Sequence, residues 1–345
     1  MSAIADAVTD RVAPPPTLDL SVVIVSWNTR DLLGRCLRSL DAALGELTPR
    51  SEVIVVDNAS TDGTPAAIRL GFPAVRLLEA GRNLGFAAAN NRGLALARGR
   101  VVCLLNPDTE PRPGALAALA DYLARHPEVG VVGPRLLNPD GSEQAVGFRF
   151  PTLVQVFLDL FPLRPLGSLA GRLAGSRLNG RYPDRPRDRP FPIDFPLGAC
   201  LVVRRAVLEE VGGLDEGYFM YGEEVDWCRR IRAAGWEIVC LPTAEVVHHG
   251  GRSTGQQPAR MFVELHRSRL RYYRRFERPA FVRAAQLITR AGVVNEALLA
   301  WRRYRRGELS RAAWRERVRT CGAIYRLKVE GRGARGEGRG AKGED

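Results

Sequence analysis

The chain has 345 residues, enough for one large α/β domain with an appendage or for two domains of ordinary size. An apolar fraction of 45% beside 26% charged residues excludes a chain that is disordered or fibrous throughout. The formal net charge of +13 is concentrated at one end, because residues 256–345 hold 23 basic and 9 acidic side chains while residues 1–255 are almost neutral. The neutral body argues against nucleic acid as a partner, and the basic segment needs its own explanation.

The six cysteines are scattered without a Cys-x-x-Cys pair, and no charged-then-apolar signal segment opens the chain. This usage predicts reduced thiols and a cytoplasmic protein. The longest apolar stretch, residues 281–301, is interrupted by Arg283, Arg290 and Glu296, so we do not expect it to span a membrane.

Short apolar runs alternate with helical patterns through the first 125 residues. Residues 1–17 contain three consecutive prolines and little periodicity, which predicts a mobile arm. Strand-like runs occupy 21–25, 52–56 and 101–105, and helical patterns follow at 31–40, after residue 63 and at 113–125. The alternation predicts an α/β fold with a mostly parallel sheet flanked by helices.

The pattern is weaker in the second half of the chain. Residues 145–195 contain an apolar piece and then a long loop rich in proline and arginine, which is usually functional or mobile in a compact domain. Further strands are expected at 199–203 and 237–241. Residues 256–329 read as basic, amphipathic helices, and residues 330–345 as a disordered Gly/Arg tail. The main domain is therefore expected to cover residues 18–255.

Polar residues follow three of the predicted strands at the point where each strand ends. Ser26 and Asn28 follow the first, Asp57 the second, and Asn106 and Asp108 the third. Each could be a polar turn or a helix cap. Ligands bind outside the carboxyl ends of strands in such sheets, so three parallel occurrences favour a binding site.

The residues that could bind a metal are an aspartate and two histidines. Asp108 lies at a strand end, and His248 and His249 arrive about 140 positions later in a Gly-rich turn. Carboxylate and diphosphate oxygens, with an imidazole, suit Mg²⁺ or Mn²⁺. The alternative is two turn histidines that cap carbonyl groups. The sequence has no zinc-type cluster, no P-loop motif and no dinucleotide-binding glycine motif, so those three chemistries lose support.

Seven short motifs occur in a specific order. They are Val22-Val23-Ile24-Val25-Ser26-Trp27-Asn28, Val55-Val56-Asp57-Asn58-Ala59-Ser60-Thr61-Asp62-Gly63-Thr64, Gly81-Arg82-Asn83-Leu84-Gly85-Phe86-Ala87 with Asn90-Asn91, Leu104-Leu105-Asn106-Pro107-Asp108, Gly198-Ala199-Cys200, Phe219-Met220-Tyr221-Gly222-Glu223-Glu224-Val225-Asp226 and His248-His249-Gly250-Gly251. Over residues 20–250 the chain resembles the inverting, nucleotide-sugar-dependent glycosyltransferases of family 2, which have the GT-A fold. Within that family it is most similar to rhamnosyltransferase-like enzymes of bacterial surface polysaccharide assembly.

The resemblance implies roles for the polar strand ends. Asp57 would accept a hydrogen bond from the pyrimidine N3–H of the donor, a group that uracil and thymine share. Asp108 matches the last acid of the family's Asp-x-Asp element and would hold the metal, whereas Asn106 replaces the first acid. His248 would be the second metal ligand, with His249 as the alternative. The other donor-binding positions implied are Ser26, Asn28, Arg82, Asn83, Asn91 and Asn106.

The catalytic base is expected among Glu223, Glu224 and Asp226. Family members usually have Glu-Asp at this step, and Glu224 occupies the position of the catalytic aspartate. Three acids that begin a helix also complement its macrodipole, whatever they catalyse. The dipole would lower a carboxyl pKa, and packing by Phe219, Met220 and Trp227 would raise it.

The resemblance therefore predicts a metal-dependent, inverting hexosyltransferase of cell-wall or surface-polysaccharide synthesis, with Mg²⁺ or Mn²⁺ as the cofactor. The expected donor is dTDP-rhamnose, and the expected acceptor is polyprenyl-linked or a polysaccharide, bound by residues 145–195. One alternative is a UDP-hexose or UDP-N-acetylhexosamine transferase. Another is a catalytically silent GT-A protein that serves as a membrane-associated scaffold.

The basic helices combine arginines with aromatic residues. Arg267, Arg269, Arg271, Arg274 and Arg275 alternate with Leu270, Tyr272, Tyr273 and Phe276, and Trp301-Arg302-Arg303-Tyr304-Arg305-Arg306 repeats the combination. This composition favours peripheral attachment to an anionic surface, here the inner face of the plasma membrane. A homo-oligomer contact and a solvated arginine-rich face are the alternatives.

Overall fold

The computed structural model describes residues 18–144, 147–161, 175–251 and 254–327. The strands are β1 (Leu18–Ser26), β2 (Ser51–Asp57), β3 (Arg76–Glu79), β4 (Gly99–Leu105), β5 (Thr109–Pro111), β6 (Val129–Leu137), β7 (Phe191–Pro192), β8 (Cys200–Arg204) and β9 (Glu237–His248). The α-helices are α1 (Arg30–Leu44), α2 (Thr64–Gly71), α3 (Phe86–Leu94), α4 (Ala115–Arg125), α5 (Leu153–Leu160), α7 (Arg205–Val211), α8 (Glu223–Ala233), α9 (Pro258–Phe276), α10 (Pro279–Arg305) and α11 (Arg311–Tyr325). The predicted arm 1–17 and tail 330–345 lie outside the described residues.

One mixed sheet organises the part of the chain that the structure describes. Its strand order is β3-β2-β1-β4-β8-β6-β9-β5, and β7 pairs with β9. The first four strands in this order are parallel, as the alternating pattern predicts. Beyond them β8 runs antiparallel to β4 and β6, and β5 and β7 run antiparallel to β9. The α/β class is confirmed, and each of these antiparallel pairings involves β8 or β9, from the second half of the chain, where the sequence pattern is weaker.

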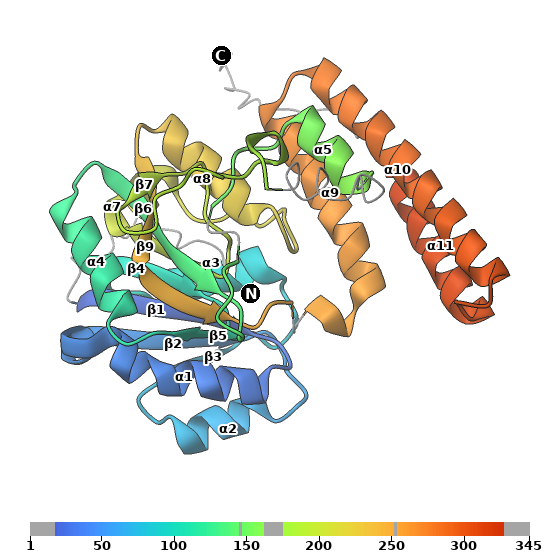
Figure 1. Ribbon diagram of the computed structural model, residues 1–345. Coiled ribbons are helices and arrows are strands. Elements are labelled where there is room, and N and C mark those ends of the chain that lie inside the picture. Colours follow the sequence, from blue (N-terminus) through green and yellow to red (C-terminus); the bar gives the residue numbers. More distant parts are fainter. Residues whose placement is uncertain (1–17, 145–146, 162–174, 252–253, 328–345) are drawn as a thin grey trace, which may run out of the picture.

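Helices cover both faces of the sheet. Side chains from α1, α2 and α4 pack on one face, and side chains from α3, α7 and α8 pack on the other (Figure 1). Successive residues of β1 enter the two cores in turn, with Val22 and Ile24 on one side and Val23 and Val25 on the other. Burial on both faces explains the continuous apolar runs in the sequence.

β9 is longer than predicted, and its end pairs with the short strand that follows β4. It extends from Glu237 to His248, beyond the predicted 237–241, so His248 ends a strand and does not lie in the Gly-rich turn. β5 pairs with the end of β9, and Thr109 stands opposite His248. This register places the residues after β4 beside a motif 140 positions later in the sequence.

The C-terminal helices are joined to the sheet domain through α9. Tyr272 and Tyr273 of α9 are buried with Tyr218 in a third apolar core, to which α5 and α10 contribute Val156 and Val282. Figure 1 shows α10 and α11 side by side, and α5 lies against α10. None of the described helices combines the length and apolar character needed to cross a bilayer.

Several arginines of α9 form ion pairs with carboxylates of the sheet domain. Arg269 pairs with Asp159, and Arg271 pairs with Asp215. Arg275 contacts both Asp215 and Asp226. These pairs reduce the net positive charge of α9, so the basic surface expected from the sequence stays a prediction.

Candidate active site

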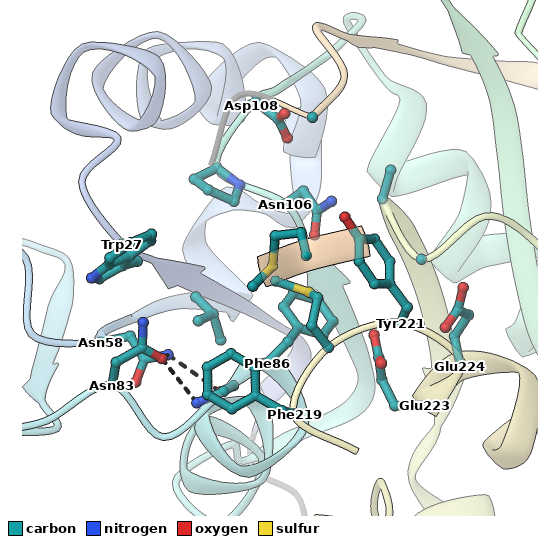
Figure 2. A pocket seen from close by; sticks show the side chains of 18 of the residues that line it. Trp27, Asn58, Asn83, Phe86, Asn106, Asp108, Phe219, Tyr221, Glu223 and Glu224 are labelled. Carbon is teal, nitrogen blue, oxygen red and sulfur yellow. Dashed lines mark hydrogen bonds between the residues drawn. The ribbon is translucent and has the colours of Figure 1, made fainter. Parts of the chain in front are cut away.

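A single cavity brings together six of the residues predicted from the sequence. They are Asn83, Asn106, Asp108, Glu223, Glu224 and His248. Figure 2 shows Trp27, Asn58 and Asn83 at one side of this cavity and the two glutamates at the other. The cavity lies where the loops after β1, β2 and β4 meet the start of α8, so the strand-end rule locates it correctly.

Asn58 holds the loop that carries Asn83. Its amide nitrogen donates to Asn83 Oδ1 at 3.1 Å and to the Gly85 carbonyl at 3.2 Å, and its oxygen accepts the Leu84 N–H at 2.8 Å. Gly85 has a φ of 84°, and a Cβ there would lie 2.6 Å from the carbonyl oxygen of Phe219. Glycine is needed because the two loops touch at this point.

Asp57 ends β2 immediately before Asn58, and its side chain is 2% exposed. Asp57 Oδ2 accepts the backbone N–H of Ser60 at 3.0 Å, while Oδ1 is buried without a hydrogen-bond partner among the described residues. An unmet buried acceptor is costly, so Oδ1 is suited to an N–H donor of a ligand.

Asp57 and four other predicted donor-binding residues lie outside the cavity lining, and the role of all five stays a prediction. Ser26 bonds the hydroxyl three residues further on, and Asn28, at a φ of 50°, accepts a backbone N–H of the β2–α2 loop. Asn91 binds both backbone polar groups of Leu214. Arg82 is exposed in the loop after β3. The first three hold loops around the cavity in place.

His248 faces Asp108 across 3.5 Å, measured from Nε2 to Oδ1, and both side chains are largely buried. Gln144 determines which imidazole nitrogen carries the proton. Its Nε2 donates to the carbonyl of His248 at 2.7 Å and to Asn138 Oδ1 at 2.8 Å, so its Oε1 accepts from His248 Nδ1, 2.9 Å away. With Nδ1 bonded to Gln144, Nε2 is the ring nitrogen that faces the carboxylate, an arrangement typical of metal-binding histidines.

The two histidines point to different partners. His249 Nε2 lies 2.7 Å from Glu110 Oε1, outside the cavity lining, so His248 is the one placed to share a cation with Asp108. An imidazole nitrogen and a carboxylate oxygen 3.5 Å apart are ligand types that a divalent cation could share. No group of three or more His, Cys, Asp or Glu ligands occurs in the described part of the chain. A metal would therefore take its other ligands from a bound diphosphate and water.

Glu223 and Glu224 begin α8 at the opposite side of the cavity in the view of Figure 2. The preceding Tyr221 and Gly222 both have positive φ, 68° and 79°, and the non-glycine value indicates a strained turn that aims the helix start at the cavity. One oxygen of each glutamate is buried without a hydrogen-bond partner in the described structure.

The surroundings raise the pKa of both carboxyl groups. For Glu223 the main cause is burial and the second is the charge of Glu224. Burial also raises the pKa of Glu224, although backbone N–H groups of the helix start oppose the rise. Desolvation of the two carboxyl groups therefore outweighs the effect of the helix terminus on their pKa values.

Asp226 is separate from this pair. It is fully buried, accepts from Arg230 Nε at 2.8 Å and Arg275 Nη1 at 3.0 Å, and accepts the Tyr218 hydroxyl at 3.2 Å. Asp226 does not line the cavity. It ties α8 to α9, and its predicted catalytic role has no support from this position.

Several cavity residues were not predicted. Trp27, Phe86, Phe219 and Tyr221 line it with aromatic rings, and Arg260 enters from α9. Trp27 lies between two predicted residues, so its neighbours were a usable signal. Arg260 follows no strand and belongs to the segment assigned to an appendage, so the sequence held no signal for it.

Comparison with known proteins agrees with this geometry. The family model described as glycosyl transferase family 2 matches residues 21–212. The chain belongs to this family. It is a glycosyltransferase, as the motif order predicts.

Individual relatives extend the match. The chain is 38% identical over 266 residues to an N-acetylglucosaminyl-diphospho-decaprenol L-rhamnosyltransferase of Mycobacterium tuberculosis, covering 72% of this chain and 82% of the relative. It is 29% identical to an O-antigen biosynthesis protein of Myxococcus xanthus, over 69% of this chain and 18% of that protein. The expected resemblance to rhamnosyltransferases is confirmed.

A solved structure shares the fold. A mannosyltransferase of Pyrobaculum calidifontis, in complex with GDP-Man and Mn²⁺, matches with a TM-score of 0.51 and 20% identity over 91% of this chain and 87% of that chain. The GT-A fold predicted for the glycosyltransferase is confirmed by this match and by the family model.

Proposed function

We propose that the protein transfers rhamnose from dTDP-rhamnose to a polyprenyl-diphosphate-linked acceptor, with inversion at the anomeric carbon, in cell-wall or surface-polysaccharide synthesis. The observation that carries the proposal is that Asp108, His248, Glu223 and Glu224 line the same cavity. The rhamnosyltransferase relative at 38% identity supports the sugar and the lipid-linked acceptor.

The nucleotide would lie over the ends of β1 and β2. The unmet Oδ1 of Asp57 would accept the pyrimidine N3–H, and Asn83, held by Asn58, would contact the donor from the adjacent loop. Asn106 lines the cavity and has a buried side-chain oxygen without a partner in the described structure, which supports a polar ligand there. The rest of the donor would extend toward Asp108.

Asp108 and His248 would hold Mg²⁺ or Mn²⁺. Bound there, the ion would offset the negative charge of the departing diphosphate. Gln144 fixes the proton on His248 Nδ1 and keeps Nε2 available.

Glu224 would be the base. Burial raises the pKa of both carboxyl groups, which suits a group that must take up a proton. Glu224 is assigned the role because it occupies the position of the family's catalytic aspartate. Glu224 accepts the proton of the acceptor hydroxyl as that oxygen bonds to the anomeric carbon. The bond from this carbon to the diphosphate oxygen breaks, and the electron pair leaves with the nucleoside diphosphate. Attack opposite the leaving group inverts the anomeric carbon.

The proposed acceptor is carried by a lipid, and α10 has a surface suited to a membrane. Leu287, Val294, Leu298 and Trp301 are all exposed, between 46% and 65%, and their spacing of seven, four and three residues places them on one face. Exposed arginines such as Arg302 lie next to this stripe. The only acid of α10, Glu296, is paired with Arg317. We therefore propose that α10 attaches the protein to an anionic leaflet at the inner face of the plasma membrane.

Vesicle sedimentation tests this attachment. The double variant Leu287→Gln with Leu298→Gln should lose binding to phosphatidylglycerol vesicles, while Leu70→Gln should not, because Leu70 is 89% exposed on α2. If the wild type ignores vesicles and forms a dimer that the double variant dissociates, the stripe is a homo-oligomer contact.

A thermal-shift panel tests the donor. The purified protein is heated with dTDP-rhamnose, UDP-glucose, UDP-N-acetylglucosamine or GDP-mannose, each with Mn²⁺ and with EDTA. A ligand that binds the native state raises the melting temperature, so dTDP-rhamnose with Mn²⁺ should give the largest rise. A larger rise with a UDP-sugar would support the UDP-hexose or UDP-N-acetylhexosamine alternative. No rise with any donor would favour a silent scaffold.

A further inference from the structure

Arg260 is a cationic side chain in the cavity that has no role in the proposed reaction. Among the described residues that line the cavity, Arg260 is the only arginine and none is a lysine. It lies in the first turn of α9, a helix of 19 residues whose N-terminal residues Gln257 and Met261 also line the cavity. A helix N-terminus favours anions, so the side chain and the helix act in the same direction.

The guanidinium of Arg260 is held without being neutralised. Its Nη1 donates to Gln257 Oε1 at 3.2 Å, and its Cζ lies 4.7 Å from the centroid of the Phe219 ring. No ion pair with a carboxylate is found for Arg260 in the described residues, whereas Arg267, further along the same helix, pairs with Glu264. Stacking on the ring orients the planar fork and leaves its other N–H groups available for a ligand.

The charge of the cavity calls for such a cation. Asp108, Glu223 and Glu224 all line it, so an anionic substrate would enter a site with three carboxyl groups. Diphosphate is the anionic group common to the proposed donor and the proposed acceptor, and arginine can bind its oxygens in a bidentate manner.

We infer that Arg260 binds a diphosphate group in the active-site cavity. The inference rests on the proposed function for the identity of that diphosphate, which belongs either to the nucleotide donor or to the lipid acceptor. Phe219 connects this contact to the start of α8. Its carbonyl accepts the Phe86 N–H at 2.7 Å, its ring supports Arg260, and it lies four residues before α8 begins at Glu223.

Isothermal titration with defined anions tests the inference. Wild type, Arg260→Ala, Arg260→Lys and the control Arg267→Ala are titrated with dTDP, dTMP and inorganic pyrophosphate in the presence of Mn²⁺. Arg260→Ala should weaken dTDP and pyrophosphate binding by about 10- to 100-fold and dTMP binding by less than about threefold. Arg260→Lys should recover part of the loss, because it keeps the charge without the fork. Arg267→Ala, outside the cavity, should match the wild type.

A second experiment measures the KM of wild type and Arg260→Ala for a short-chain N-acetylglucosaminyl diphosphate lipid as the acceptor. Unchanged dTDP binding with a tenfold higher acceptor KM in Arg260→Ala would assign the contact to the acceptor diphosphate. Unchanged affinities and KM would overturn the inference, as would equal losses for dTDP and dTMP. The pyrophosphate titration needs neither sugar nor turnover, so it distinguishes failure of this inference from failure of the proposed rhamnosyl transfer.

Discussion

The two sides of the cavity each carry a pair of titratable groups, but their surroundings differ. Asp108 and His248 face each other across 3.5 Å, and Gln144 holds the imidazole through Nδ1 and the backbone of His248 through its carbonyl group. Glu223 and Glu224 each keep one buried oxygen without a partner in the described structure, and burial raises both pKa values. The proposed roles follow this difference, since a held imidazole beside a carboxylate suits cation binding and a carboxyl group with a raised pKa suits proton transfer.

Removal of the proposed base should give the largest effect. Glu224→Gln should lower kcat by about 10³-fold, because an amide cannot accept the acceptor's proton, while the Kd for dTDP-rhamnose changes by less than about threefold. Rapid-quench turnover and titration calorimetry measure the two quantities. Glu209→Gln, on the exposed surface of α7, is the control. Turnover above about a tenth of the wild-type rate would move the role to Glu223.

Removal of the Asp108 carboxylate should abolish the dependence of dTDP binding on Mn²⁺. Asp108→Ala should lower turnover by about 100-fold and make dTDP binding the same in Mn²⁺ and in EDTA, because one of the two proposed protein ligands is lost. Titrations in both buffers measure this. Asp188→Ala, at an exposed position, should retain the wild-type response. A persistent Mn²⁺ effect in Asp108→Ala would place the metal elsewhere.

Substitution of Gln144 should have a smaller effect, limited to metal binding by Asp108 and His248. Gln144→Ala should weaken Mn²⁺ binding to the dTDP complex by about tenfold, because His248 loses the acceptor that holds its proton on Nδ1. Gln144→Glu should recover part of that loss, since a carboxylate oxygen can accept the same proton. Electron paramagnetic resonance of free Mn²⁺ measures the affinity. Equal losses in both variants would mean that Gln144 acts only by packing.

The smallest effect should appear in stability as a function of pH. The folded-state pKa of Glu223 is raised above its unfolded value, so its contribution to stability is full below the unfolded pKa and is lost as pH rises through the folded pKa. Glu223→Gln cannot ionise, so its melting temperature should exceed that of the wild type by about 2 °C at pH 8 and by less at pH 4.5. Calorimetry at the two pH values measures the difference, and a pH-independent offset would contradict the assignment.

The donor-binding residues could be predicted from the sequence because each lies close in the chain to the strand that positions it. Each of β1, β2 and β4 is a short apolar run whose polar end follows directly, so Asp57, Asn106 and Asp108 could be found from strand ends alone. The pairing of His248 with Asp108 could not be derived from local pattern, since it depends on the register of β5 against β9. Arg260 was out of reach for the same reason, because it enters the cavity from α9.

The sequence by itself determined the family, the α/β class and the acids and amides that follow the strands, because apolar periodicity and motif order are local properties of a chain. The tertiary structure alone decided that His248 and not His249 faces Asp108. It also decided that Asp226 is paired with Arg230 and Arg275, and that residues of α9 line the cavity. These outcomes depend on contacts between segments far apart in the chain, where burial and neighbouring charges set the state of each group.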